Sequence, residues 1–200
     1  MKRLIYLISP NKIYKNFYID LKKVLKTKKV KYFQLRLKKI SKNRNVIIAK
    51  KIKAITKKYN VKLIINDSAE IAKKVNADGC HIGQSDGDLS KTKKILKNKI
   101  VGVTCHNSKV LAQIAIKNKA DYIAFGAFNS SKTKNVKFIA KTNLLKKVNK
   151  LANIPIVAIG GINNINYKKL LLNKANFLAI SGYIWNNKKL KPVEAIKKLK

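Results

Sequence analysis

Acidic residues are scarce in this 200-residue sequence. Eight aspartates and glutamates stand against 47 lysines and arginines, which gives a formal net charge of +39 at neutral pH. A basic surface favours nucleic-acid binding through counterion release. However, the lysines are spread through every expected helix, and arginine occurs only at Arg3, Arg36 and Arg44. We therefore expect solvated lysine-rich surfaces without a specific nucleic-acid partner, and a positive field that attracts anionic substrates.

Cysteines and long apolar runs are also scarce. Two cysteines give no disulfide framework and fit a reducing cytosol. No stretch approaches the roughly 20 apolar residues of a membrane-spanning helix, and the N-terminal apolar run is too short for a signal peptide. We expect a cytoplasmic protein without a membrane partner. The 46% apolar content is enough for the core of one domain over residues 1–200.

Short β-branched apolar runs alternate with amphipathic helical patterns along the whole chain. The expected strands are 3–9, 31–37, 62–66, 79–82, 100–104, 121–126, 154–159 and 177–181. The expected helices are 13–25, 44–59, 68–75, 90–96, 108–117, 139–151, 166–173 and 192–200. The alternation predicts a parallel sheet, and eight units predict an α/β fold closed into a single (β/α)₈ barrel. The pattern leaves the oligomeric state open.

Half of the acidic residues fall in the stretch 63–86, namely Asp67, Glu70, Asp78 and Asp86. Asp67 stands at the end of one expected strand, and Asp86 follows the next. Right-handed crossovers make such strands parallel, so both aspartates open at the same edge of the sheet. We expect them to be close enough to share a metal ion.

Asn66 and Gln84 accompany these aspartates and add amide oxygens. Two carboxylates with an amide and water suit Mg²⁺, which takes hard oxygen ligands. A general acid–base pair is the competing chemical role. Helix capping is the structural alternative for Asp67, but it does not explain Asp86.

The strand expected at 31–37 ends with alternating polar and apolar residues. Because side chains alternate along a strand, Gln34, Arg36 and Lys38 share one face, and Leu35 and Leu37 share the other. If the leucines face the helices, the polar three line the barrel mouth and form an anion site. The alternative is a partly polar, exposed edge strand.

Two further segments suit phosphate binding. The loop 129–135 combines hydroxyl side chains with lysines, which suits a loop that closes over a phosphate group. The composition equally suits a solvated lysine-rich loop. Gly160 and Gly161 follow the seventh strand, and Ser181 and Gly182 follow the eighth. Barrels bind phosphate at these strand ends through backbone N–H groups.

The histidines and cysteines do not predict a zinc site. Cys80–His81 and Cys105–His106 are adjacent pairs, and neighbours on a strand point to opposite faces. We expect both cysteines to be small core residues. His106 remains a candidate for hydrogen bonding to substrate.

The expected mouth therefore holds two anion sites with a magnesium site between them, and no obvious pair of nucleophile and base. This pattern suits a metal-bound diphosphate leaving group and a phosphorylated second substrate.

At this point the chain resembles the thiamine phosphate synthase family. The segments that carry the resemblance run in family order: 34–38, 66–67, 77–86, 102–106, 120–126, 131–134, 159–162 and 180–181. The most specific is the run Ala-Asp-Gly-Cys-His-Ile-Gly-Gln-Ser-Asp at 77–86. The resemblance implies a (β/α)₈ barrel that joins hydroxymethylpyrimidine diphosphate to thiazole phosphate with Mg²⁺ and releases diphosphate.

The resemblance also implies roles for residues of this chain. The implied contacts to the pyrimidine diphosphate are Gln34, Arg36, Lys38, Asn66, Thr104 and Lys134, of which Arg36, Lys38, Thr104 and Lys134 are the expected catalytic residues. The implied Mg²⁺ ligands are Asp67 and Asp86. The implied thiazole phosphate contacts are Ser131, Thr133, Gly161, Ile180 and Ser181.

The chain departs from the family pattern at four positions. Leu37 stands where Glu is usual, on the face that alternation turns away from the mouth. Thr104 replaces Ser and keeps the hydroxyl. Ser131 replaces Thr, and Ser130 replaces the Pro before it, which predicts a looser phosphate loop.

Two other functions compete with the synthase. A thiazole tautomerase of the same barrel family would use a histidine near the end of the fifth strand, where His106 stands. A non-catalytic barrel that binds RNA would use the basic surface. The joint presence of Asp67, Asp86, Arg36 and Lys38 favours the synthase.

Overall fold

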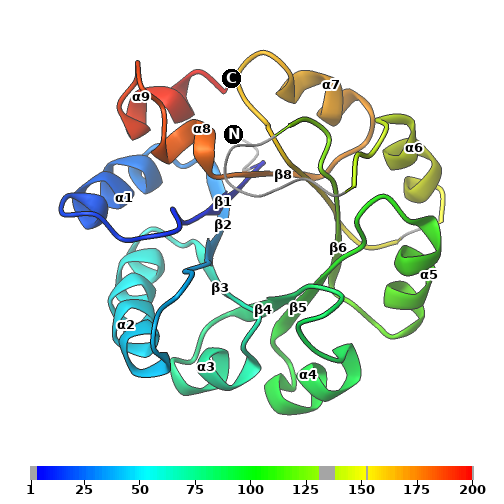
Figure 1. The fold of residues 1–200 in the computed structure, drawn as a ribbon, viewed down its shortest axis with the longest axis horizontal. Helices are drawn as coiled ribbons and strands as arrows, with labels where there is room; N and C mark the ends of the chain where they lie inside the picture. Colours follow the sequence, from blue (N-terminus) through cyan, green and yellow to red (C-terminus); the bar gives the residue numbers. More distant parts are fainter. Residues whose placement is uncertain (1–3, 131–137, 152, 200) are drawn as a thin grey trace.

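Parallel strands close into a barrel with helices around it (Figure 1). The structure is a computed structural model that describes residues 4–130, 138–151 and 153–199. In these ranges the strands follow the order β1 to β8, each pairs in parallel with the next, and β8 pairs with β1. The predicted (β/α)₈ barrel is confirmed.

The elements keep the predicted alternation. The strands are β1 Ile5–Ile8, β2 Val30–Leu35, β3 Lys62–Asn66, β4 Gly79–Ile82, β5 Ile100–Thr104, β6 Tyr122–Phe125, β7 Ile156–Ile159 and β8 Phe177–Ile180. The helices are α1 Phe17–Lys26, α2 Lys42–Lys58, α3 Ala69–Lys74, α4 Leu89–Leu96, α5 Lys109–Lys117, α6 Asn143–Asn149, α7 Tyr167–Leu172, α8 Gly182–Trp185 and α9 Pro192–Lys197. The four-residue helix α8 was not predicted, because it is too short to show a helical period.

Side-chain caps set the start of four helices. Ser41, Ser68, Asp88 and Ser108 each accept the backbone N–H of the third residue after them. This bond satisfies one of the N–H groups that a helix start leaves without a partner. The caps fix where α2, α3, α4 and α5 begin.

The strand that was predicted at 31–37 is shorter than expected, because β2 ends at Leu35. Beyond it, the Arg36 backbone N–H donates to Ser9 Oγ at 2.9 Å, and the Ser9 hydroxyl donates to the Arg36 carbonyl at 3.1 Å. At Arg36 the side chain of Ser9 thus takes the place of a backbone partner from the neighbouring strand. Lys38 lies outside the strand and is exposed.

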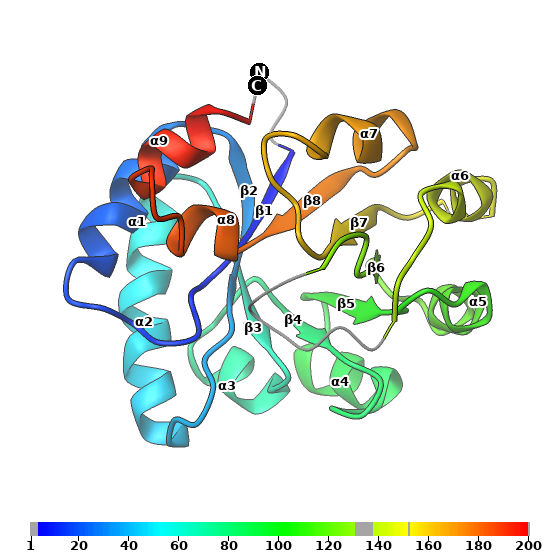
Figure 2. The ribbon, with the colours of Figure 1, turned by 45° about the horizontal axis from the view of Figure 1, so that its top comes forward.

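Apolar residues fill two layers. The larger layer lies between the strands and the helices, and it includes Leu35 with Leu37 packed against it, as alternation predicted. The smaller layer lies inside the barrel, and it includes Tyr6, Ile64 and Tyr122. Both views show α1, α2 and α3 side by side outside β1–β3 (Figure 1 and Figure 2).

A repeated polar contact closes pairs of strands. The side chain of the residue just before β4, β6 and β8 accepts a backbone N–H from the start of the preceding strand. Asp78 accepts from Leu63 on β3, Asp121 from Val101 on β5, and Asn176 from Ile156 on β7. Each contact joins an odd strand to the next even strand at the end opposite the mouth. Asp78 also pairs with Lys53 at 2.6 Å and with Lys62 at 3.5 Å.

Among the described residues, no helix combines the length and the apolar character that crossing a membrane requires.

Replacement of Asp78 by alanine is expected to destabilise the barrel. Burial raises the pKa of Asp78, but the bonds from Lys53 and Leu63 and the charge of Lys62 outweigh it and hold the pKa below its ordinary value. Loss of these charge-assisted bonds should lower the free energy of unfolding by roughly 1.5–3 kcal/mol at neutral pH. Urea unfolding of both proteins measures the difference.

The pH dependence provides the control for this prediction. The folded-state pKa is lowered, so the stabilisation is complete above the unfolded-state value of about 3.9 and is lost as the pH falls through the folded-state pKa. The difference between wild type and Asp78→Ala should therefore shrink in acid. A difference that persists undiminished would contradict the ion-pair account.

Candidate active site

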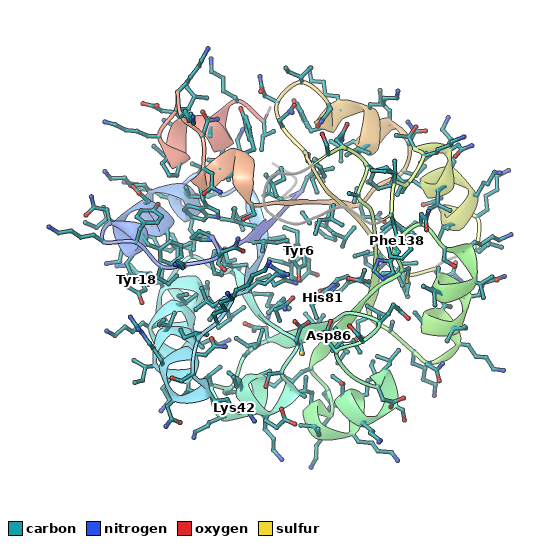
Figure 3. All side chains as sticks on the ribbon, in the orientation of Figure 1. Tyr6, Tyr18, Lys42, His81, Asp86 and Phe138 are labelled. Carbon is teal, nitrogen blue, oxygen red and sulfur yellow. The ribbon has the colours of Figure 1, made fainter. Side chains whose placement is uncertain are left out.

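A cavity of about 920 Å³ lies at the carboxyl ends of the strands. Its lining includes residues at or just after every strand, for example Ser9, Arg36, Asp67, Asp86 and Ser181. Figure 3 shows Tyr6 and His81 toward the centre of the strand ring and Asp86 on its β4–β5 side, whereas Tyr18 and Lys42 lie out among the helices. A barrel places its active site at this face.

The cavity brings most of the predicted site residues together. The lining includes Gln34, Arg36, Asn66, Asp67, Asp86, Thr104, Gly161, Ile180 and Ser181. Lys38 is not among the residues that line it, and it lies exposed three positions beyond the end of β2. Ser131, Thr133 and Lys134 lie outside the described residues.

Backbone constraints turn Asp67 and Asp86 toward the cavity rim. Asp67 adopts a φ of 62°, and its N–H donates to the His81 carbonyl at 2.8 Å. The side-chain amide of Asn66 donates to the Asp67 carboxylate. The carboxylate of Asp86 folds over Gly83, where any Cβ would overlap it.

The donor set of this rim fits Mg²⁺. Both aspartates are exposed, so their carboxylate oxygens are accessible to a cation and to water. The described residues contain no group of three or more His, Cys, Asp or Glu side chains that could hold a metal. Two carboxylates with water and substrate oxygens suit Mg²⁺, whereas an all-protein cage would need more ligands.

Hydrogen bonds at the end of β1 connect the first, second and eighth strands. Ser9 holds the backbone of Arg36 through its hydroxyl. The Ser181 hydroxyl donates to the Ser9 carbonyl at 3.0 Å, and the Trp185 indole N–H donates to the Ile8 carbonyl at 2.6 Å. These contacts fix Arg36 and the N-terminus of α8 on one side of the cavity.

Sequence reasoning missed a polar network inside the barrel. His81 Nδ1 lies 2.9 Å from Tyr122 Oη, and His81 Nε2 lies 2.8 Å from Thr104 Oγ1. Tyr122 Oη in turn lies 2.7 Å from Tyr6 Oη, which also accepts from the Gln34 amide at 3.2 Å. The tyrosines stand in apolar strand patterns, so the sequence marks them as core. One signal could have placed His81 in the barrel interior. Neighbours on a strand point to opposite faces, so a Cys80 side chain that faces the helices turns His81 inward.

Burial keeps the imidazole of His81 neutral. Burial lowers its pKa to about 4, and the positive charge of Arg36 lowers it as well. His81 therefore carries no positive charge at neutral pH.

The two cysteines are buried core residues, as predicted. Burial raises the pKa of the Cys105 thiol to about 12, and burial with the charge of Asp67 does the same for Cys80. Neither thiol forms the thiolate that a nucleophile requires.

The glycine pair after β7 makes close contact with the loop that follows β6. Gly161 has a φ of 58°, and a Cβ there would overlap the carbonyl oxygen of Ser130. A Cβ on Gly160 would overlap Ala127. The glycines thus allow a close approach of the neighbouring loop. Phosphate binding at Gly160 and Gly161 stays a prediction.

His106 and Phe138 form the rim beside this loop. Both line the cavity, and their ring centroids lie 4.4 Å apart. Phe138 is labelled at the edge of the ring of strands in Figure 3. The predicted placement of His106 at the mouth is confirmed.

Fold and site together define a (β/α)₈ barrel with a polar cavity at its mouth, where enzymes of this fold bind small molecules. The sequence model of the family described as thiamine monophosphate synthase matches residues 5–184. The chain belongs to this family.

Named relatives agree with this assignment. A thiamine-phosphate synthase of Pelagibacter ubique is 64% identical over 200 residues, which span 100% of this chain and 97% of that protein. A thiamine-phosphate synthase of Erythrobacter litoralis is 37% identical and spans 96% and 92%. The solved thiamine phosphate pyrophosphorylase of Pyrococcus furiosus superposes with a TM-score of 0.88 over 98% of this chain and 93% of that one, and its 24% identity supports the fold.

Replacement of Gly161 by alanine is expected to destabilise the mouth. The new Cβ would be strained at a positive φ and would push against Ser130. We expect a loss of about 1–3 kcal/mol in the free energy of unfolding, measured by urea denaturation. Gly182 at the start of α8 is the matched control, because alanine suits a helix there. A Gly161→Ala protein as stable as Gly182→Ala would contradict the packing.

Proposed function

We propose that this chain joins hydroxymethylpyrimidine diphosphate to thiazole phosphate, which yields thiamine phosphate and diphosphate. The observation that carries the proposal is the shared cavity of Asp67, Asp86 and Arg36 in a chain of this family. The names of the relatives support the same reaction. One catalytic domain over residues 1–200, working in the cytoplasm on these two small molecules, is part of the proposal.

The reaction needs charge stabilisation more than proton transfer. The carbon–oxygen bond to the diphosphate breaks first, and the electron pair leaves with the diphosphate. The thiazole nitrogen then donates its lone pair to the pyrimidine methylene cation. When bound by Asp67 and Asp86, Mg²⁺ supplies positive charge to the departing diphosphate.

The protein's own groups divide the remaining work. Arg36 lines the cavity as a half-buried cation and offers a planar donor fork to phosphate oxygens. Thr104 and Gln34 present a hydroxyl and an amide on the inner wall. Gly161 and Ser181 on the opposite strand ends suit the thiazole phosphate. We assign Lys38, Ser131, Thr133 and Lys134 to the two phosphate groups from the family resemblance alone.

The competing tautomerase reaction has one observation in its favour. His106 lies at the mouth, as a tautomerase histidine would. That reaction does not require the carboxylates of Asp67 and Asp86 together with Arg36, so their joint presence in the cavity favours the synthase.

The purified protein is expected to form thiamine phosphate from the two phosphorylated substrates with Mg²⁺ and to stop when a chelator is added. Asp67→Ala and Asp86→Ala should each lower Mg²⁺-dependent turnover at least roughly 100-fold while the fold persists. Product can be measured by chromatography, and the fold by circular dichroism.

Asp88→Ala is the matched control for these variants. Asp88 lies two positions beyond Asp86, caps α4 and is not among the residues that line the cavity. Its loss should cost about 1 kcal/mol of stability and leave turnover unchanged. Unchanged turnover in Asp67→Ala would remove the metal assignment. Absence of product from folded wild type would reject the synthase and direct the next assay to tautomerisation with His106 variants.

An RNA-binding function makes a different prediction. Binding through the basic surface alone should weaken steeply as salt is raised and should survive Asp67→Ala. We expect fluorescence anisotropy with a single-stranded RNA to show weak binding that added salt abolishes. Binding that is tight at physiological salt would favour the non-catalytic alternative.

A further inference from the structure

Five side chains from five strands form a continuous hydrogen-bond chain through the barrel interior. In order they are Gln34 on β2, Tyr6 on β1, Tyr122 on β6, His81 on β4 and Thr104 on β5. The successive distances are 3.2, 2.7, 2.9 and 2.8 Å. We call this set the interior chain. Figure 3 shows its members Tyr6 and His81 near the centre of the barrel.

The interior chain forms part of the inner wall of the cavity and is most exposed at its Thr104 end. Tyr6, Gln34, Tyr122 and His81 are all buried, with exposed fractions of 2%, 3%, 3% and 8%. Thr104 is partly exposed and lines the cavity. Because each buried group depends on its neighbours for partners, the proton positions along the chain depend on one another.

The Gln34 end sets the direction of every bond. The Gln34 amide donates to Tyr6 Oη, so the single Tyr6 hydroxyl proton points to Tyr122. The Tyr122 proton then points to Nδ1 of His81, which must accept. In that tautomer the remaining ring proton is on Nε2 and is donated to Thr104 Oγ1.

This order of donors and acceptors determines the role of the Thr104 hydroxyl. Its oxygen already accepts from His81, so its own proton is not used within the interior chain. Thr104 lines the same cavity as Arg36, whose charge reaches His81. A hydroxyl proton that points into this cavity is available to an acceptor oxygen of a bound ligand.

The neighbouring strand is shaped to admit the interior chain. Gly102 on β5 stands directly opposite Tyr122 on β6 in the strand register. A Cβ on Gly102 would overlap the Tyr122 ring. The absence of a side chain at Gly102 gives the phenol the space to reach both Tyr6 and His81.

We propose that His81 and Tyr122 are positioning residues that turn the hydroxyl proton of Thr104 into the cavity, where Thr104 donates to an anionic oxygen of the diphosphate substrate. The identity of that ligand rests on the proposed function. The order of the hydrogen bonds rests on the geometry of the interior chain alone.

Nitrogen NMR of the wild-type protein tests the order directly. The chain has two histidines, His81 and His106, so ¹⁵N-histidine labelling gives two ring systems, and His106→Asn assigns them. We expect His81 at neutral pH to carry its proton on Nε2 and to show an unprotonated Nδ1. A proton on Nδ1 would overturn the proposal, because Thr104 would then donate to His81 and not into the cavity.

Tyr122→Phe removes one hydroxyl and keeps the ring. We expect its kcat/KM for thiamine phosphate formation to fall roughly 3- to 10-fold, the worth of one hydrogen bond. Tyr32→Phe is the matched control. Tyr32 packs on Tyr6 and Tyr122, with ring centroids 5.5 and 6.2 Å away, and its hydroxyl is not part of the interior chain. Tyr32→Phe should leave kcat/KM and the His81 tautomer as in wild type.

A double-mutant cycle separates positioning from general structural support. If Tyr122 acts through Thr104, Tyr122→Phe should cause no further loss in a Thr104→Val protein. Equal losses in both backgrounds would overturn the proposal. If wild type made no thiamine phosphate, the proposed function would fail, while the His81 spectrum would still decide the direction of the interior chain. If Tyr122→Phe does not fold, the His81 spectrum of the wild-type protein still tests the direction of the interior chain.

Discussion

Parallel closure of the strands is the constraint on which the rest of the structure depends. Every strand pairs in parallel with both neighbours, so all the strand carboxyl ends meet at one mouth. Residues as distant in sequence as Ser9 and Ser181 are thereby brought within hydrogen-bond distance. Closure therefore gathers polar residues from every β/α unit into one cavity.

The two ends of the barrel use the few acidic residues for different purposes. Away from the mouth, Asp78 and Asp121 join neighbouring strands and pair with lysines. At the mouth, Asp67 and Asp86 remain exposed on the cavity rim. In a chain of net charge +39, the surrounding positive field suits an anionic substrate, and the rim carboxylates are the proposed ligands of a cation.

The sequence was sufficient for the barrel and for much of its mouth. The strands follow from short apolar runs, and Asp67 and Asp86 follow from their places after successive strands. The end of β2 was not predictable, because it depends on a contact with Ser9, which follows β1. The interior chain was missed because Tyr6 and Tyr122 resemble ordinary core residues until the register places their hydroxyls together. The close approach of Gly161 to Ser130 was likewise not predictable, because it joins two loops that lie far apart in sequence.

The central claim is that Asp67 and Asp86 hold one divalent cation against the diphosphate. Anomalous diffraction from crystals grown with Mn²⁺ and inorganic diphosphate tests this most directly, because Mn²⁺ occupies the same oxygen sites as Mg²⁺. The account predicts one anomalous peak in contact with both carboxylates and with the diphosphate. A peak that contacts neither aspartate, or separate peaks on each, would contradict it.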